Sequence, residues 1–178
     1  MSACLSNHVS VYACRCQLNA IPADAYHVTC LSADFRFISP REQRVLRRYP
    51  LIVDDLVDIY LTTDRANRIG CCTLYSTTYV LITRLRNEDS PTLQSLKKAI
   101  RSLAQQSVFH ASKLVFNFTE DDFARYEVDT LANILLTEFE KTYRKAGRYI
   151  QLYICLHRQE VEAIHARIQR RAVRRISS

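Results

Sequence analysis

Short apolar runs alternate with amphipathic helical segments along this 178-residue chain, and this alternation constrains its fold more than any other feature. Runs rich in β-branched, aromatic and cysteine residues are typical of strands in a covered sheet. Intervening segments with apolar residues three and four positions apart predict helices. The expected strands are Val9–Cys14, Ala25–Leu31, Ile69–Tyr75, Tyr79–Thr83, Lys113–Phe118 and Tyr149–Leu156.

Capping residues mark where the expected helices begin and end. Ser39-Pro40-Arg41-Glu42 combines a capping serine, a proline at the first helical position and the glutamate of a capping box, and Pro50 ends that helix. Ser90-Pro91 repeats this start for a helix reaching about Phe109, and Gly147 can end the helix expected within 128–146 in the left-handed conformation. The other expected helices lie within 51–60 and 157–178.

Strands separated by helices predict an α/β sandwich of three layers, with a mixed, mostly parallel sheet covered on both faces. Ile69–Tyr75 and Tyr79–Thr83 are close enough to form an antiparallel hairpin. We therefore expect one domain over residues 1–156 and a basic, amphipathic helical extension over residues 157–178.

The composition limits where the chain works and which cofactors it can hold. Its cysteines are seven in number and lie mostly in apolar runs, which favours a reduced interior of the cell, nuclear or cytoplasmic with the nucleus preferred, over secretion. Cys14-x-Cys16 and Cys71-Cys72 lack the spacing and histidine partners of a zinc site, so no metal or cofactor is expected. No apolar stretch is long enough to span a membrane.

Glycine is unusually scarce, because only Gly70 and Gly147 occur. Loops that wrap a phosphate use glycine to bring backbone N–H groups close to the anion. The scarcity argues against such a loop anywhere in the chain.

Several local strings resemble the macrodomain family, in particular the small branch of terminal ADP-ribose glycohydrolases that remove ADP-ribose from glutamate. The resemblance covers roughly residues 9–156. Its carriers are Cys30-Leu31-Ser32-Ala33-Asp34-Phe35-Arg36, Tyr79-Val80-Leu81-Ile82-Thr83-Arg84 and Ser90-Pro91-Thr92-Leu93-Gln94-Ser95-Leu96. It implies a macrodomain fold whose loops hold adenine with a Gly-Asp pair, the distal ribose with a Gly-Ala-Gly loop and the diphosphate with a glycine-rich loop.

The binding positions implied by this resemblance are all altered. The Gly-Asp pair falls near Arg15-Cys16, and the small-residue loop becomes Phe37-Ile38-Ser39-Pro40. The diphosphate loop becomes Thr119-Glu120-Asp121-Asp122-Phe123-Ala124, whose carboxylates repel phosphate. The catalytic lysine implied by the resemblance is Arg84, which cannot supply a free amine. Its aspartate partner falls on Ala124 without gaps, or on Asp122 after a two-residue shift.

Other candidate sites are weaker. The five histidines are scattered, and Asp54-Asp55-x-x-Asp58 is more typical of the solvated face of a short helix than of a metal site. No catalytic residue is therefore expected, and the chain is expected not to be an enzyme.

The last 22 residues carry six arginines and two glutamates, more than half of the net charge of +7. A helix here would place arginines on one stripe and apolar residues on another, either to bind a partner or to pack the apolar edge on the body. The candidate binding residues are Ile164, Arg167, Ile168, Arg170, Arg171, Arg174 and Arg175. We expect a noncatalytic, macrodomain-like module that binds a protein partner or forms a homodimer. The alternatives are nucleic-acid binding through residues 157–178 and residual binding or hydrolysis of ADP-ribose.

Overall fold

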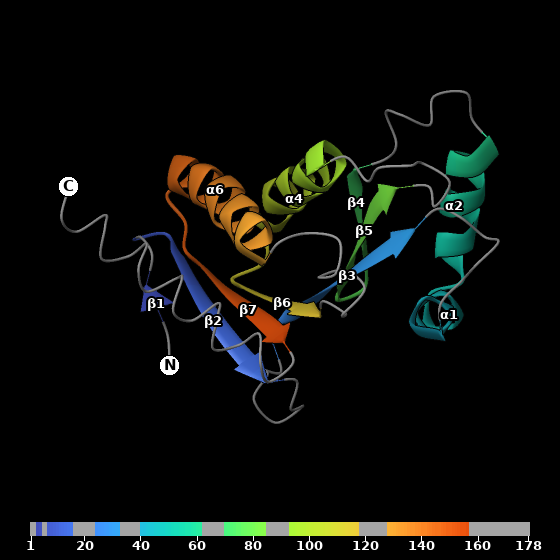
Figure 1. The fold of residues 1–178 in the computed structure, drawn as a ribbon, viewed down its shortest axis with the longest axis horizontal. Coiled ribbons are helices and arrows are strands. Elements are labelled where there is room, and N and C mark those ends of the chain that lie inside the picture. Colours follow the sequence, from blue (N-terminus) through green and yellow to red (C-terminus); the bar gives the residue numbers. More distant parts are fainter. Residues whose placement is uncertain are drawn as a thin grey trace. The chain divides into compact units, whose positions relative to one another are not determined.

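A computed structural model describes residues 3–4, 7–15, 24–32, 40–61, 70–84, 93–117 and 128–156. Seven strands follow the order β1-β2-β7-β6-β3-β5-β4 (Figure 1). The strands are β1 Ala3–Cys4, β2 Val9–Arg15, β3 Tyr26–Ser32, β4 Cys71–Tyr75, β5 Thr78–Arg84, β6 Lys113–Asn117 and β7 Ile150–Leu156. The helices are α1 Pro40–Arg48, α2 Leu51–Leu61, α4 Leu93–Ser107 and α6 Val128–Ala146. The expected mixed, mostly parallel α/β sheet is confirmed.

Contacts divide the chain into two compact units. Unit 1 comprises Met1–Thr29 and Ala104–Ser178, and unit 2 comprises Cys30–Leu103. The expected extension, residues 157–178, lies outside the described residues.

In unit 1, β7 lies between β2 and β6 and is parallel to both, while β1 adds an antiparallel edge. Alternate residues of these strands form a buried apolar face against which α6 packs (Figure 1). The Phe116 and Phe139 rings meet edge to face at 6.1 Å, and Phe139 stacks on Tyr143 at 5.9 Å. The Tyr143 hydroxyl donates to Ser107 Oγ at 3.0 Å. Burial raises the pKa of Tyr143 to about 12, so its phenol stays protonated near neutral pH.

Gly147 ends α6 as expected, in the left-handed conformation with φ of 62°. The amide of Arg148 donates to the Tyr143 carbonyl at 3.0 Å, and that of Gly147 donates to Arg144 at 3.2 Å. These two bonds satisfy carbonyls that the end of a helix leaves open.

In unit 2, β4 and β5 form the expected antiparallel hairpin, and its tight turn is made by Ser76 with φ of 54°. Val80 and Ile82 of β5 pack with Leu31 and with Ile52 of α2. Val45 and Leu46 of α1 also pack against this cluster, as does Tyr49, which directly follows that helix. Tyr79 and Leu81, which alternate with Val80 and Ile82 along β5, are also fully buried. This strand is therefore covered on both faces, as its continuous apolar run predicts.

Gly70 directly precedes β4, and its backbone lies close to the backbone of α4. Its φ is +80°, and a Cβ atom placed there would lie 2.7 Å from the Ser95 carbonyl oxygen of α4. The Ser95 hydroxyl in turn donates to the Thr83 carbonyl at 2.6 Å. Only glycine combines this conformation with this contact.

Candidate functional site

Ligands of open α/β sheets bind outside the carboxyl ends of the parallel strands. In unit 1, three parallel strands end at one edge, because Arg15 of β2 pairs with Leu156 of β7 and Asn117 of β6 pairs with Cys155. We call this the strand-end edge. In unit 2, β5 ends at Arg84.

Outside the described residues lie the segments that follow β2, β3, β5 and β6, which are residues 16–23, 33–39, 85–92 and 118–127. The altered positions expected at 37–39 and 119–124, including Asp122 and Ala124, belong to them. Arg15 is the last residue of β2, and Arg84 is the last residue of β5. Sequence shows that none of these segments contains a glycine.

The expected binding residues of the C-terminal segment, Ile164, Arg167, Ile168, Arg170, Arg171, Arg174 and Arg175, also lie outside the described residues. They stay a prediction from sequence alone.

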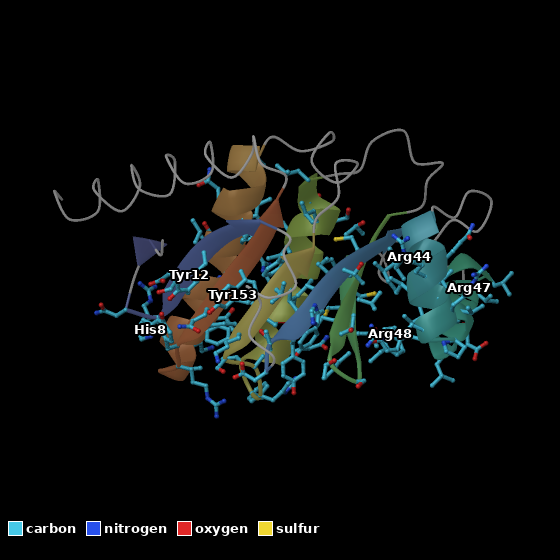
Figure 2. The ribbon with its side chains drawn as sticks, turned by 90° about the horizontal axis from the view of Figure 1, so that it is seen from below. His8, Tyr12, Arg44, Arg47, Arg48 and Tyr153 are labelled. Atoms are coloured by element: carbon cyan, nitrogen blue, oxygen red, sulfur yellow. The ribbon has the colours of Figure 1, made fainter. Side chains whose placement is uncertain are left out.

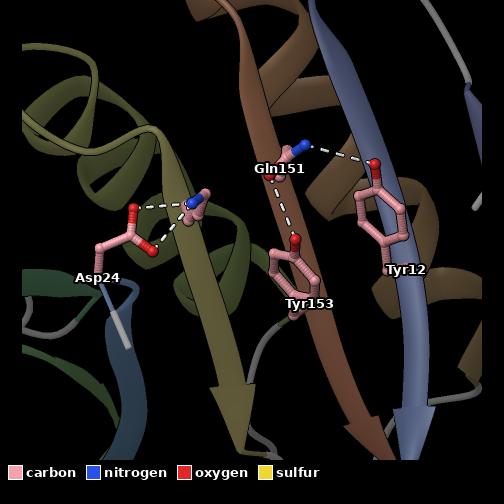
Figure 3. A network of polar contacts seen from close by, with 5 residues as sticks. Tyr12, Asp24, Gln151 and Tyr153 are labelled. Carbon is pink, nitrogen blue, oxygen red and sulfur yellow. Dashed lines mark hydrogen bonds and ion pairs between the residues drawn. The ribbon is translucent and has the colours of Figure 1, made fainter. Parts of the chain in front are cut away.

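A polar face of unit 1, opposite the face that α6 covers, was not predicted as a site. Tyr12 of β2 and Tyr153 of β7 are paired in register, and their rings stack at 4.9 Å (Figure 2). Gln151 bridges them, since its amide donates to Tyr12 at 3.4 Å and its carbonyl accepts from the Tyr153 hydroxyl at 3.2 Å (Figure 3). The sequence signal is the alternation of Val9 and Val11 with Ser10 and Tyr12.

An ion pair lies beside the two tyrosines. Lys113 at the start of β6 holds both carboxylate oxygens of Asp24, at 2.7 and 2.9 Å (Figure 3). The bond to Lys113 lowers the pKa of Asp24, and the same bond raises the pKa of Lys113. Both groups are therefore charged near neutral pH and neutralise each other. Desolvation raises the pKa of Tyr153, so its phenol does not supply a base there.

A basic face lies on α1 in unit 2. Arg44, Arg47 and Arg48 are exposed and, being three and four positions apart, share one side of the helix (Figure 2). The Arg48 guanidinium lies 5.6 Å from the centre of the Tyr49 ring. We call these three residues the arginine face. Their charge suits an acidic partner.

Potential metal ligands are scattered in the described part of the chain. It contains no group of three or more histidine, cysteine, aspartate or glutamate side chains that could hold a metal. Asp54 and Asp58 of α2 are exposed, in agreement with a solvated helix face. Cys72 is buried, and burial raises the pKa of its thiol, so it acts as a small apolar residue.

No helix among the described residues is both long and apolar enough to cross a membrane. No protein-family model and no curated protein matches the sequence.

Solved structures do resemble the chain. The macrodomain of Thermus aquaticus DarG is 10% identical with a TM-score of 0.55, over 83% of this chain and 99% of that chain. The macrodomain of Mycobacterium tuberculosis DarG is 10% identical with a TM-score of 0.57, over 82% of this chain and 98% of that one. The Oceanobacillus iheyensis macrodomain with MES bound is 10% identical with a TM-score of 0.60, over 98% and 97%. The chain therefore has the macrodomain fold.

Proposed function

We propose that this chain is a noncatalytic module with the macrodomain fold, which binds a protein partner and neither binds nor hydrolyses ADP-ribose. The observation that carries the proposal is the placement of its two glycines. Gly70 serves a backbone contact before β4, and Gly147 ends α6. The loops that follow β2, β3, β5 and β6 hold none, so they lack the residue on which backbone binding of a diphosphate depends.

Arg84 supports the same proposal. It ends β5 at the position that the resemblance assigns to a nucleophilic lysine. A guanidinium stays protonated at physiological pH and does not attack a glycosidic carbon as an amine would.

The distribution of charge supports binding to an acidic partner. Pro40–Arg48 carries four arginines and one glutamate, and residues 157–178 carry six arginines and two glutamates. These two segments together account for the entire net charge of +7. Because the remainder is balanced, an acidic surface would be attracted to these two segments.

Partner capture tests the interaction module. Full-length protein and its Arg170→Gln, Arg171→Gln, Arg174→Gln, Arg175→Gln variant are crosslinked in extracts that have been treated with nuclease, and bound proteins are identified by mass spectrometry. The wild-type chain is expected to retain one protein in near-stoichiometric amount, and the variant to lose most of it. If nuclease removes everything that the wild-type chain retains, the protein-binding proposal is wrong and the nucleic-acid alternative replaces it.

A further inference from the structure

Unit 1 has a second edge, where β2, β6 and β7 begin, that gathers cationic and aromatic side chains. Lys141, Arg144, Lys145 and Arg148 are all exposed near the end of α6. Phe109 follows α4 and is 76% exposed, and Tyr149 is 43% exposed. We call these six residues the basic-aromatic patch.

Hydrogen bonds fix the backbone of this patch. The Arg148 guanidinium donates to the carbonyls of Val108 at 2.8 Å and Phe109 at 3.0 Å. These bonds connect the turn after α4 to the short segment between α6 and β7. His8 Nδ1 donates to the Arg148 carbonyl at 3.0 Å. The Tyr149 hydroxyl donates to Ser10 at 2.6 Å. These hydrogen bonds hold the turn that carries Phe109 in place. The exposed ring therefore loses little conformational freedom when it binds a ligand.

The charges around the patch are mainly cationic, because the Asp24 carboxylate near the start of β6 is paired with Lys113. Glu138 of α6 is only 3% exposed, so its carboxylate is shielded from the surface. Glu140, which is half-buried, is the acidic residue nearest in sequence to the cations of the patch. Cations at the end of a helix also offset its dipole, so Arg144 and Lys145 alone would need no partner. That role does not account for an exposed phenylalanine beside them.

We propose that the basic-aromatic patch binds single-stranded nucleic acid, with phosphates held by Arg144, Lys145 and Arg148 and one base stacked on Phe109. Cations that follow a backbone and an aromatic ring that stacks on a base are the two elements of sequence-tolerant single-strand binding. A duplex offers its phosphates but not the face of a base, so the ring favours a single strand. The patch lies at the opposite ends of the strands from the strand-end edge, so the inference is independent of the proposed function.

Fluorescence anisotropy of a labelled oligothymidylate, titrated with the full-length protein over a range of salt concentrations, tests the proposal. The measurements use the variant in which Arg170, Arg171, Arg174 and Arg175 are glutamine, so that the C-terminal arginines do not mask the patch. Phe109→Ala is expected to weaken binding about tenfold, whereas Phe109→Tyr, which keeps the ring, stays within about twofold of the parent. Leu51→Ala, which truncates another exposed apolar side chain (70%), serves as the matched control and is expected to change nothing.

The charges are tested through the salt dependence of the same binding. Arg144→Gln with Lys145→Gln is expected to reduce the slope of log K against log salt by about 1.4, which corresponds to two phosphate contacts on a single strand. Lys97→Gln with Lys98→Gln removes equal charge from exposed positions of α4 to which no binding role is given, and is expected to leave the slope unchanged. The proposal is overturned if Phe109→Ala binds as the parent does, if the two pairs lower the slope equally, or if a polyglutamate peptide binds more tightly than the oligonucleotide.

Discussion

Replacing Phe139 by alanine is expected to lower the free energy of unfolding by about 3–5 kcal/mol. Phe139 is fully buried between α6 and the sheet of unit 1, where it meets the rings of Phe116 and Tyr143. Its loss removes both ring contacts and leaves a cavity that its neighbours fill only in part. Urea denaturation followed by circular dichroism measures the change.

Phe109→Ala is the matched control, because it makes the same chemical change at a ring that is 76% exposed. It is expected to alter the free energy of unfolding by no more than about 0.5 kcal/mol. Equal effects at the two positions would contradict the core described for unit 1. A stable Phe109→Ala variant also ensures that its binding measurement reports on the surface.

Gly70→Ala is expected to lower the free energy of unfolding by about 2–4 kcal/mol. An alanine here would hold a φ of +80°, and its Cβ would lie 2.7 Å from the Ser95 carbonyl oxygen. The first effect strains the new residue, and the second forces α4 away from the start of β4. The same urea experiment reports the sum.

Gly147→Ala separates these two causes. Gly147 has a φ of +62° with no atom within 4 Å of the added Cβ, so strain alone remains and about 1 kcal/mol is expected. A cost at Gly147 equal to that at Gly70 would show that the contact with Ser95 is unimportant.

Local chemistry was sufficient to predict most helix and strand positions. Pro40 begins α1 where the proline rule places it, and Gly147 ends α6 with the expected positive φ. The strand expected to begin at Ile69 begins instead at Cys71, because Gly70 turns the backbone just before it. The helix expected to reach about Phe109 ends at Ser107, whose carbonyl accepts from the amides of His110 and Ala111 in a turn.

Pairing between distant segments could not be predicted in the same way. β1 has two residues, too few for any periodicity, and exists through its antiparallel register with β2. The order of the strands depends on contacts between segments more than 100 residues apart, such as Tyr12 with Tyr153.

The candidate sites show the same division between local and distant signals. The arginine-rich C-terminal segment was evident because its residues are contiguous, and it stays a prediction. The basic-aromatic patch was not predicted, because Phe109 was expected only as the approximate end of one helix, and Arg148 lies about 40 residues further along the chain. Only the fold brings them together, through the hydrogen bonds of Arg148 to Val108 and Phe109.

Calorimetric titration of the full-length protein with ADP-ribose tests the central claim most directly. The loops after β2, β3, β5 and β6 have no glycine, and three carboxylates of residues 120–122 stand where the resemblance places the diphosphate. The account predicts no saturable heat up to millimolar ADP-ribose, from a sample that shows a cooperative unfolding transition. A micromolar dissociation constant with one site per chain would contradict it and restore the ligand-binding alternative.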